Sequence, residues 1–81
     1  MPAASYRMKR YADLSGESGV EAYRITPTSI FVRFRNRAAP YEYSSSGRAG
    51  PEKVARMKAL AVAGRGLSTF ISRHAHDDYE R

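Results

Sequence analysis

The chain has no cysteine among its 81 residues, which excludes disulfides, thiolate chemistry and cysteine metal ligands. It also lacks any apolar run near the roughly 20 residues that a membrane-spanning helix requires. The N-terminal stretch MPAASYRMKRYADLSG has no apolar core of the secretory type, so we expect no export signal. The default expectation is therefore a cytoplasmic protein that does not insert into a membrane.

Acidic residues are also scarce. Eight Asp and Glu stand against fourteen Lys and Arg, and eleven of those fourteen are arginine. The net charge is +6 and the isoelectric point is near 10.1. Such a surface attracts polyanions, chiefly nucleic acid, by contacting phosphates and releasing counterions. The alternative is a basic domain that binds no polyanion and whose net charge only prevents self-association.

The length allows one domain with a thin core, because a chain this short buries roughly 60–65% of its unfolded surface. Residues 1–19 have no periodic pattern and end in a glycine-containing loop, so we expect an N-terminal arm that can be flexible. Tyr6 and Tyr11 can lie against the domain, and Met8 is a second candidate for the start of translation. The folded domain is expected over residues 20–81.

A period of two begins at Val20 and predicts strands. The segment VEAYRIT alternates, residues 26–29 form a turn, and IFVRFRNR alternates again as the second arm of a hairpin. The segment YEYS, residues 41–44, predicts a short third strand with both tyrosines on one face. In the second arm, one face would carry Ile30, Val32 and Phe34, and the other would carry Phe31, Arg33, Arg35 and Arg37.

Helical spacing follows the loop SSGRAG. Pro51 opens the predicted helix, because its missing N–H costs nothing in the first turn. Val54, Met57, Leu60 and Ala61 recur at helical spacing and predict a core face. Beyond a glycine pair, a second apolar stripe is expected at Leu67, Phe70, Ile71 and His74.

The order of these segments predicts an α+β fold, in which a three-stranded antiparallel sheet is followed by one or two C-terminal helices packed on one face. The face without helices would carry Arg33 and Arg35, and Arg37 continues the alternation. These arginines are candidates for phosphate contacts, and a base could stack on Phe31. The alternative is a solvated strand face on which the arginines pair with Glu21 or Glu42.

The segment VAGRGLSTFI raises the question of a phosphate-binding loop. Such loops follow a strand and carry a longer glycine signature or a lysine, whereas here a helix precedes and no lysine follows. The pattern favours a joint between two helices, with Gly64 as the left-handed C-cap and Ser68 or Thr69 capping the next helix. The auxiliary candidates for nucleic-acid contacts are Arg65, Lys9 and Arg10.

The remaining polar residues do not suggest catalysis. His74 and His76 are two residues apart on a predicted helix end and point away from each other, so a metal site is not evident. No nucleophile–base–acid set is recognisable. We therefore expect no enzymatic activity, no cofactor and no metal. Tyr41 and Tyr43 are either a stacking platform for bases or the edge of the core.

The hairpin, the tyrosine-x-tyrosine strand, the proline-led helix and the later glycine together resemble the KTSC domain. This small module is named for the C-terminus of a lysyl-tRNA synthetase and also occurs as a stand-alone bacterial protein. The resemblance covers residues 20–79, implies binding to RNA and transfers no catalytic residue. The matching positions are Ile30, Val32, Phe34, Tyr41, Tyr43, Pro51, Val54, Gly64, Leu67, Ile71 and Tyr79.

Two functional hypotheses follow. The leading hypothesis is a non-enzymatic module that binds nucleic acid, more specifically RNA, through a basic sheet face. The alternative is a protein-interaction or structural module, such as a homodimer, that adds a partner's strand to a free sheet edge at residues 41–44.

Overall fold

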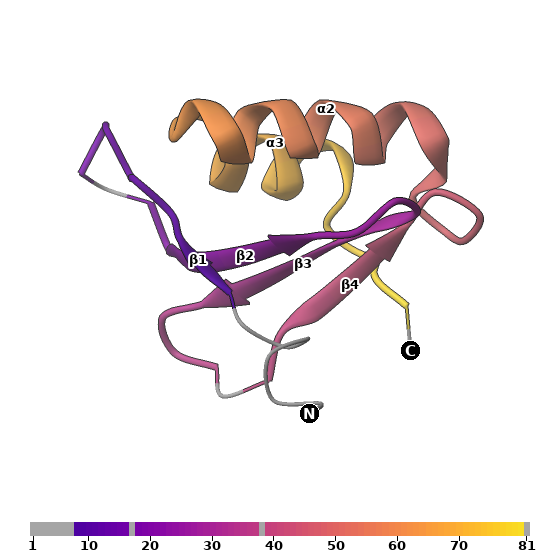
Figure 1. Ribbon diagram of the computed structural model, residues 1–81, viewed down its shortest axis with the longest axis horizontal. Helices are drawn as coiled ribbons and strands as arrows, with labels where there is room; N and C mark the ends of the chain where they lie inside the picture. Colours follow the sequence, from indigo (N-terminus) through magenta and orange to yellow (C-terminus); the bar gives the residue numbers. More distant parts are fainter. Residues whose placement is uncertain (1–7, 17, 38, 81) are drawn as a thin grey trace.

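The computed structural model describes residues 8–16, 18–37 and 39–80. The strands form one antiparallel sheet in the order β1-β2-β3-β4, and Figure 1 shows both helices on the same face of it. The predicted α+β class, with helices on one face, is confirmed, but the sheet has four strands and not three. The elements are β1 (Lys9–Arg10), β2 (Val20–Ile25), β3 (Ser29–Phe34), β4 (Tyr41–Ser44), α2 (Gly50–Ala63) and α3 (Leu67–His74).

The additional strand, β1, lies in the segment that we predicted to be an arm. Its two residues pair with β2, and Tyr11 directly after them is 3% exposed and belongs to the core. Two residues are too few to produce a period-two pattern, which is why the sequence did not reveal this strand. Residues 1–7, and with them the prediction for Tyr6, lie outside the described residues.

The β2–β3 hairpin closes at the predicted turn, where the Thr26 N–H donates to the Ser29 carbonyl at 2.9 Å. The strand β3 ends at Phe34, although the alternating pattern in the sequence continues to Arg37. The Arg37 N–H donates to the Phe34 carbonyl at 3.0 Å, which turns the chain toward β4. Arg35 and Arg37 therefore lie in the β3–β4 connection and not on a continuous strand face, which corrects the prediction.

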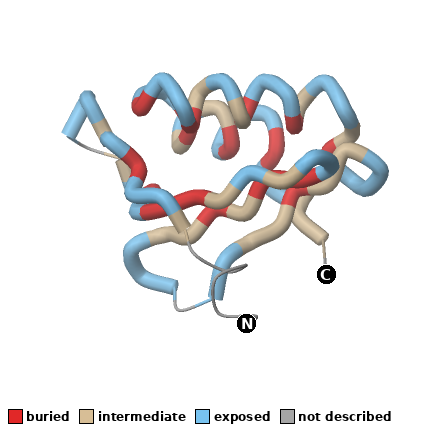
Figure 2. Tube along the Cα trace, viewed as in Figure 1, coloured by how far each residue is buried: buried red, intermediate tan, exposed pale blue. Residues whose placement is uncertain are grey.

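The core lies between the sheet and the helices, and Figure 2 shows buried residues on their facing sides. Burying each large apolar side chain there stabilises the fold by roughly 1.5–3 kcal/mol. His74, predicted to continue the apolar stripe of α3, is exposed, with its ring 5.1 Å from that of Phe70. The largest side chains that are almost fully buried are Tyr43, Ile30, Met57, Leu67, Val20, Val32 and Val54.

The joint between α2 and α3 has the predicted backbone geometry. Gly64 has φ +79°, and its N–H donates to two carbonyls in the last turn of α2. The prediction that Ser68 or Thr69 caps α3 is wrong. The Leu67 N–H instead donates to the hydroxyl of Tyr11 at 3.3 Å, so a residue from the start of the domain caps this helix.

Candidate functional site

The six cations predicted to contact nucleic acid do not share one surface. Arg10 and Arg33 are both register partners of Ala22, so the three side chains point to the same side of the sheet. Ala22 is 4% exposed but is not part of the hydrophobic core, because it lies on the face opposite the helices. Arg10 and Arg33 thus flank a small residue on the helix-free face.

Arg24 joins this face, although sequence analysis did not select it. Arg24 and Phe31 are register partners, and the guanidinium carbon of Arg24 lies 5.6 Å from the centroid of the Phe31 ring. An apolar hollow of about 190 Å³ beside them is completed by Met8 and Pro40. Applying the same alternation to the first arm of the hairpin would have found Arg24. We call Arg10, Arg24, Arg33 and Phe31 the basic sheet face.

The described acids near the basic sheet face, Glu21 and Glu42, leave most of its positive charge unpaired. Arg33 pairs with Glu21, as one of our alternatives predicted, at 3.6 Å between Nη2 and Oε1, and these side chains are 37% and 47% exposed. Exposed pairs of this kind contribute about 0–1 kcal/mol, so a phosphate can compete for Arg33. The Glu42 carboxylate accepts a hydrogen bond from the Ser29 hydroxyl at 2.9 Å and forms no ion pair with a described arginine.

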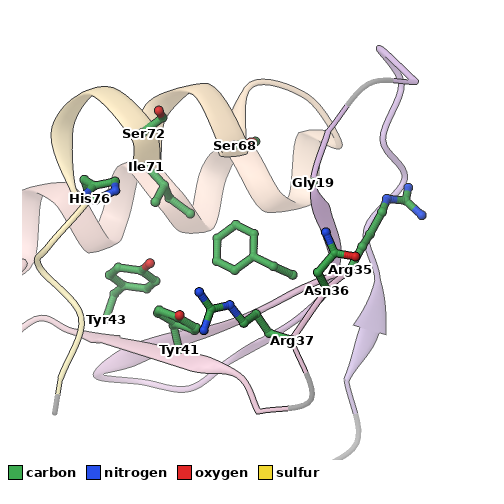
Figure 3. Close-up of a pocket in the computed structure, with 11 residues that line it drawn as sticks. Gly19, Arg35, Asn36, Arg37, Tyr41, Tyr43, Ser68, Ile71, Ser72 and His76 are labelled. Atoms are coloured by element: carbon green, nitrogen blue, oxygen red, sulfur yellow. The ribbon is translucent and has the colours of Figure 1, made fainter.

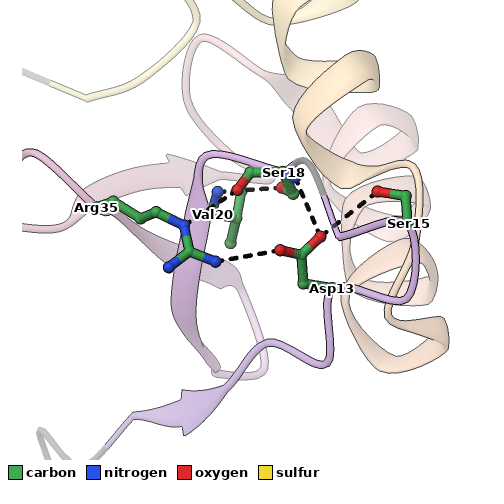
Figure 4. A network of polar contacts seen from close by, with 5 residues as sticks. All are labelled: Asp13, Ser15, Ser18, Val20 and Arg35. Carbon is green, nitrogen blue, oxygen red and sulfur yellow. Dashed lines mark hydrogen bonds and ion pairs between the residues drawn. The ribbon is translucent and has the colours of Figure 1, made fainter.

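Arg35 is held by the loop between β1 and β2 (Figure 4). Its Nη2 lies 3.1 Å from Oδ2 of Asp13, and its Nε donates to the Ser18 carbonyl at 3.2 Å. The Ser18 N–H donates to the other Asp13 oxygen, and this hydrogen bond, assisted by Arg35, holds the pKa of Asp13 below 3.8. Arg35 therefore fastens a loop and does not join the basic sheet face.

Arg37 lies on the helix side of the sheet, at a pocket of about 450 Å³ between the β3–β4 connection, β4 and α3. Its guanidinium carbon is 5.9 Å from the centroid of the Tyr41 ring, and Figure 3 shows it directed toward that ring. Tyr43 forms part of the wall, and burial raises the pKa of its hydroxyl to about 12, so it stays neutral near pH 7. We call this site the turn pocket.

The other two predicted cations are isolated from the basic sheet face. Lys9 is the register partner of Tyr23, a core residue, and therefore lies on the helix side, where it lines a hollow together with Val62 of α2. Arg65 is exposed at the joint of α2 and α3. The structure thus keeps Arg10 and Arg33 together, adds Arg24, and separates Lys9 and Arg65 from them.

The edge of β4, which we predicted to be free, is partly covered by residues 76–80, here called the C-terminal tail. The Glu80 N–H donates to the Glu42 carbonyl at 2.7 Å, and the Glu80 carboxylate accepts from the Arg48 N–H at 2.9 Å. The ring centroid of Tyr79 lies 4.7 Å from that of Tyr41. A partner's strand would have to displace this tail to pair along β4.

Within residues 8–16, 18–37 and 39–80, no group of three or more His, Asp or Glu is placed to hold a metal ion. His76 Nδ1 and Asp77 Oδ1 are 3.1 Å apart in an exposed pair. In the same part of the chain, no helix is both long and apolar enough to cross a membrane.

Comparison with known proteins adds no family. No family model matches the chain, and no curated protein or solved structure matches it either. The resemblance to the KTSC domain therefore stays a prediction.

Proposed function

We propose that this protein is a non-enzymatic module that binds RNA through the basic sheet face. The observation that carries the proposal is the juxtaposition of three arginines and an aromatic ring on the sheet face that the helices leave uncovered. The arginines would contact phosphates, and a base would stack on Phe31 above the apolar hollow.

Charge and exposure support this role. The whole chain carries a net charge of +6, and the ion pair between Arg33 and Glu21, the one that the described residues form on this face, is exposed and weak. Single-stranded RNA suits the site better than duplex DNA, because unstacked bases can lie flat on an aromatic ring. The resemblance to the KTSC domain, a module thought to bind RNA, agrees with this proposal.

A fluorescence-anisotropy titration with labelled single-stranded RNA of mixed sequence tests the proposal. If three arginines contact phosphates, the logarithm of the association constant should fall against the logarithm of salt concentration with a slope of about −2. The double variant Arg24→Glu, Arg33→Glu should weaken binding by at least about tenfold, since it removes two phosphate contacts and adds repulsion. Circular dichroism checks that the variant folds.

The matched control reverses two other exposed arginines, Arg56 on α2 and Arg73 on α3. The variant Arg56→Glu, Arg73→Glu has the same net charge as the sheet-face variant but leaves the basic sheet face intact. It should retain most of the affinity. Equal losses in the two double variants would mean that net charge alone drives binding, and no RNA binding at low salt would refute the proposal outright.

The alternative, a homodimer or protein-interaction module that uses the β4 edge, is less well supported because the C-terminal tail occupies the Glu42 carbonyl on that edge. Multi-angle light scattering discriminates between the two functions. A stable dimer whose mass is insensitive to salt and RNA would favour the alternative.

A further inference from the structure

The turn pocket lies on the opposite face of the sheet from the basic sheet face. At about 450 Å³ it falls within the range typical of small-molecule sites, about 300–1,000 Å³. Its walls come from the β3–β4 connection, β4 and α3 (Figure 3), and Gly19, Phe34 and His76 complete them.

The charge around the turn pocket favours an anion. Among the described residues that line it, Arg35 and Arg37 carry positive charge and none is acidic. Arg35 is already paired with Asp13, and Figure 3 shows it pointing away from the pocket. Arg37 forms no ion pair with any acid in the described part of the chain, and a guanidinium is suited to bidentate contact with phosphate.

The apolar part of the turn pocket favours a planar ring. Phe34 and Tyr41 are only partly buried, and their ring centroids are 5.6 Å apart at 87°, an edge-to-face pair that presents aromatic surface to the hollow. Asn36, Ser68 and Ser72 also line it, and their side chains have no hydrogen bond to another described residue. Neutral donors and acceptors around an aromatic wall suit a nucleobase and ribose better than a plain aromatic acid.

We propose that the turn pocket binds a single nucleotide, with its base against Phe34 and Tyr41 and its phosphate at Arg37. The nucleotide can be a free mononucleotide or the terminal nucleotide of an RNA chain, which share this chemistry. The site does not depend on the basic sheet face, because none of its lining residues belongs to that face.

Isothermal titration with AMP, GMP, CMP and UMP, and ¹⁵N–¹H spectra of the full chain, test the site. At least one mononucleotide should bind and shift the amide signals of Asn36, Ser68 and Ser72. Adenosine, ribose 5-phosphate and inorganic phosphate should each bind at least about tenfold more weakly than AMP, because each lacks one half of the recognised group. No binding of any mononucleotide at about 1 mM, or equal binding of 4-hydroxybenzoate or phosphate, would overturn the proposal.

Two variants test separately the phosphate contact of Arg37 and the free volume of the turn pocket. Arg37→Ala should weaken AMP binding by about tenfold while leaving adenosine binding unchanged, since only the phosphate contact is lost. Ser72→Phe, which projects a ring from α3 into the hollow, should abolish both. The matched control is Arg73→Ala, an exposed arginine one residue further along α3, and it should bind AMP normally. Unchanged AMP affinity in Arg37→Ala would contradict the site.

The source of the nucleotide is resolved in the Arg24→Glu, Arg33→Glu background, in which the basic sheet face is disabled. If a short RNA with a 5′-phosphate displaces AMP from this variant, the ligand is the terminal nucleotide of an RNA chain. If AMP binds this variant and the RNA does not displace it, the ligand is the free mononucleotide. If this background binds no AMP although wild type does, the turn pocket is not the binding site. Loss of RNA binding with AMP binding retained would leave both proposals standing.

Discussion

Asp13 is a single residue whose local contacts make the stability of the fold depend on pH. Its carboxylate accepts the Ser18 N–H and pairs with Arg35, and its pKa lies below the ordinary 3.8. Because the folded-state pKa is lower than the unfolded one, the carboxylate contributes stability in full above about pH 4, and this contribution is lost as pH falls through the folded-state pKa.

We therefore predict that Asp13→Asn lowers the free energy of unfolding at pH 7. The variant should also lose less of this free energy than wild type when the pH is lowered. Urea denaturation of both proteins at about pH 7 and about pH 3 measures this. The two proteins should differ less at the lower pH, where the wild-type carboxyl is becoming protonated. An equal difference at both values would show that the Asp13 charge does not contribute.

Gly64 is a residue whose role is fixed by backbone geometry. With φ +79°, a side chain there is strained, and an added Cβ would lie 2.7 Å from Cβ of Ala12. Gly64→Ala should lower the free energy of unfolding by about 1–3 kcal/mol. Its neighbour Arg65 is exposed, so Arg65→Ala should stay within about 0.5 kcal/mol of wild type in the same urea titration. A larger loss of stability in Arg65→Ala than in Gly64→Ala would refute the role of Gly64 as a C-cap.

At the scale of elements, β1 ties the start of the domain to its last helix. Tyr11 follows β1, is buried in the core, and accepts the hydrogen bond of the Leu67 N–H at the start of α3. Tyr11→Phe keeps the ring but removes this acceptor and should cost about 0.5–1.5 kcal/mol in urea denaturation. A chain that begins at Val20 should lose cooperative thermal unfolding altogether. Cooperative unfolding of that chain would show that β1 is dispensable.

The C-terminal tail is the element that covers the β4 edge. Truncation after Asp78 removes the Glu80 N–H that occupies the Glu42 carbonyl and the Tyr79 ring that packs on Tyr41. Exposed strand edges pair with other chains, so the truncated protein should self-associate more strongly than the full chain. Sedimentation velocity over a range of concentrations measures this. Identical association of both proteins would mean that the tail does not protect the edge.

At the scale of the whole molecule, the sheet separates the two proposed binding surfaces. Arg24 and Arg33 lie on its helix-free face, whereas Arg37 faces the turn pocket on the helix side. Changes at distant sites without shared partners are usually additive. The triple variant Arg24→Glu, Arg33→Glu, Arg37→Ala should therefore lose RNA binding as the double variant does and AMP binding as Arg37→Ala does. A marked departure from additivity would show that the two faces communicate.

The sequence predicted the elements whose patterns are long or carry strong local signals. The hairpin, the Pro51 helix start and the Gly64 C-cap are all present, because alternation, a missing N–H and a positive φ act within a few residues. It did not predict β1, whose two residues form a strand only because β2 lies beside them. Nor did it predict the Tyr11 cap, which joins residues far apart in the chain.

For the candidate site, alternation correctly gave Arg33 the face opposite Val32, because side chains of successive strand residues point to opposite sides. The sequence by itself thus determined the α+β elements, the core stripes and the excess of arginine. Only the tertiary structure decided which arginines lie on the same face of the sheet. Strand register placed Arg10 and Arg33 on either side of Ala22, and the ion pair with Asp13 holds Arg35 in a loop contact. Cross-strand pairing and ion pairs depend on distances that the sequence order does not contain.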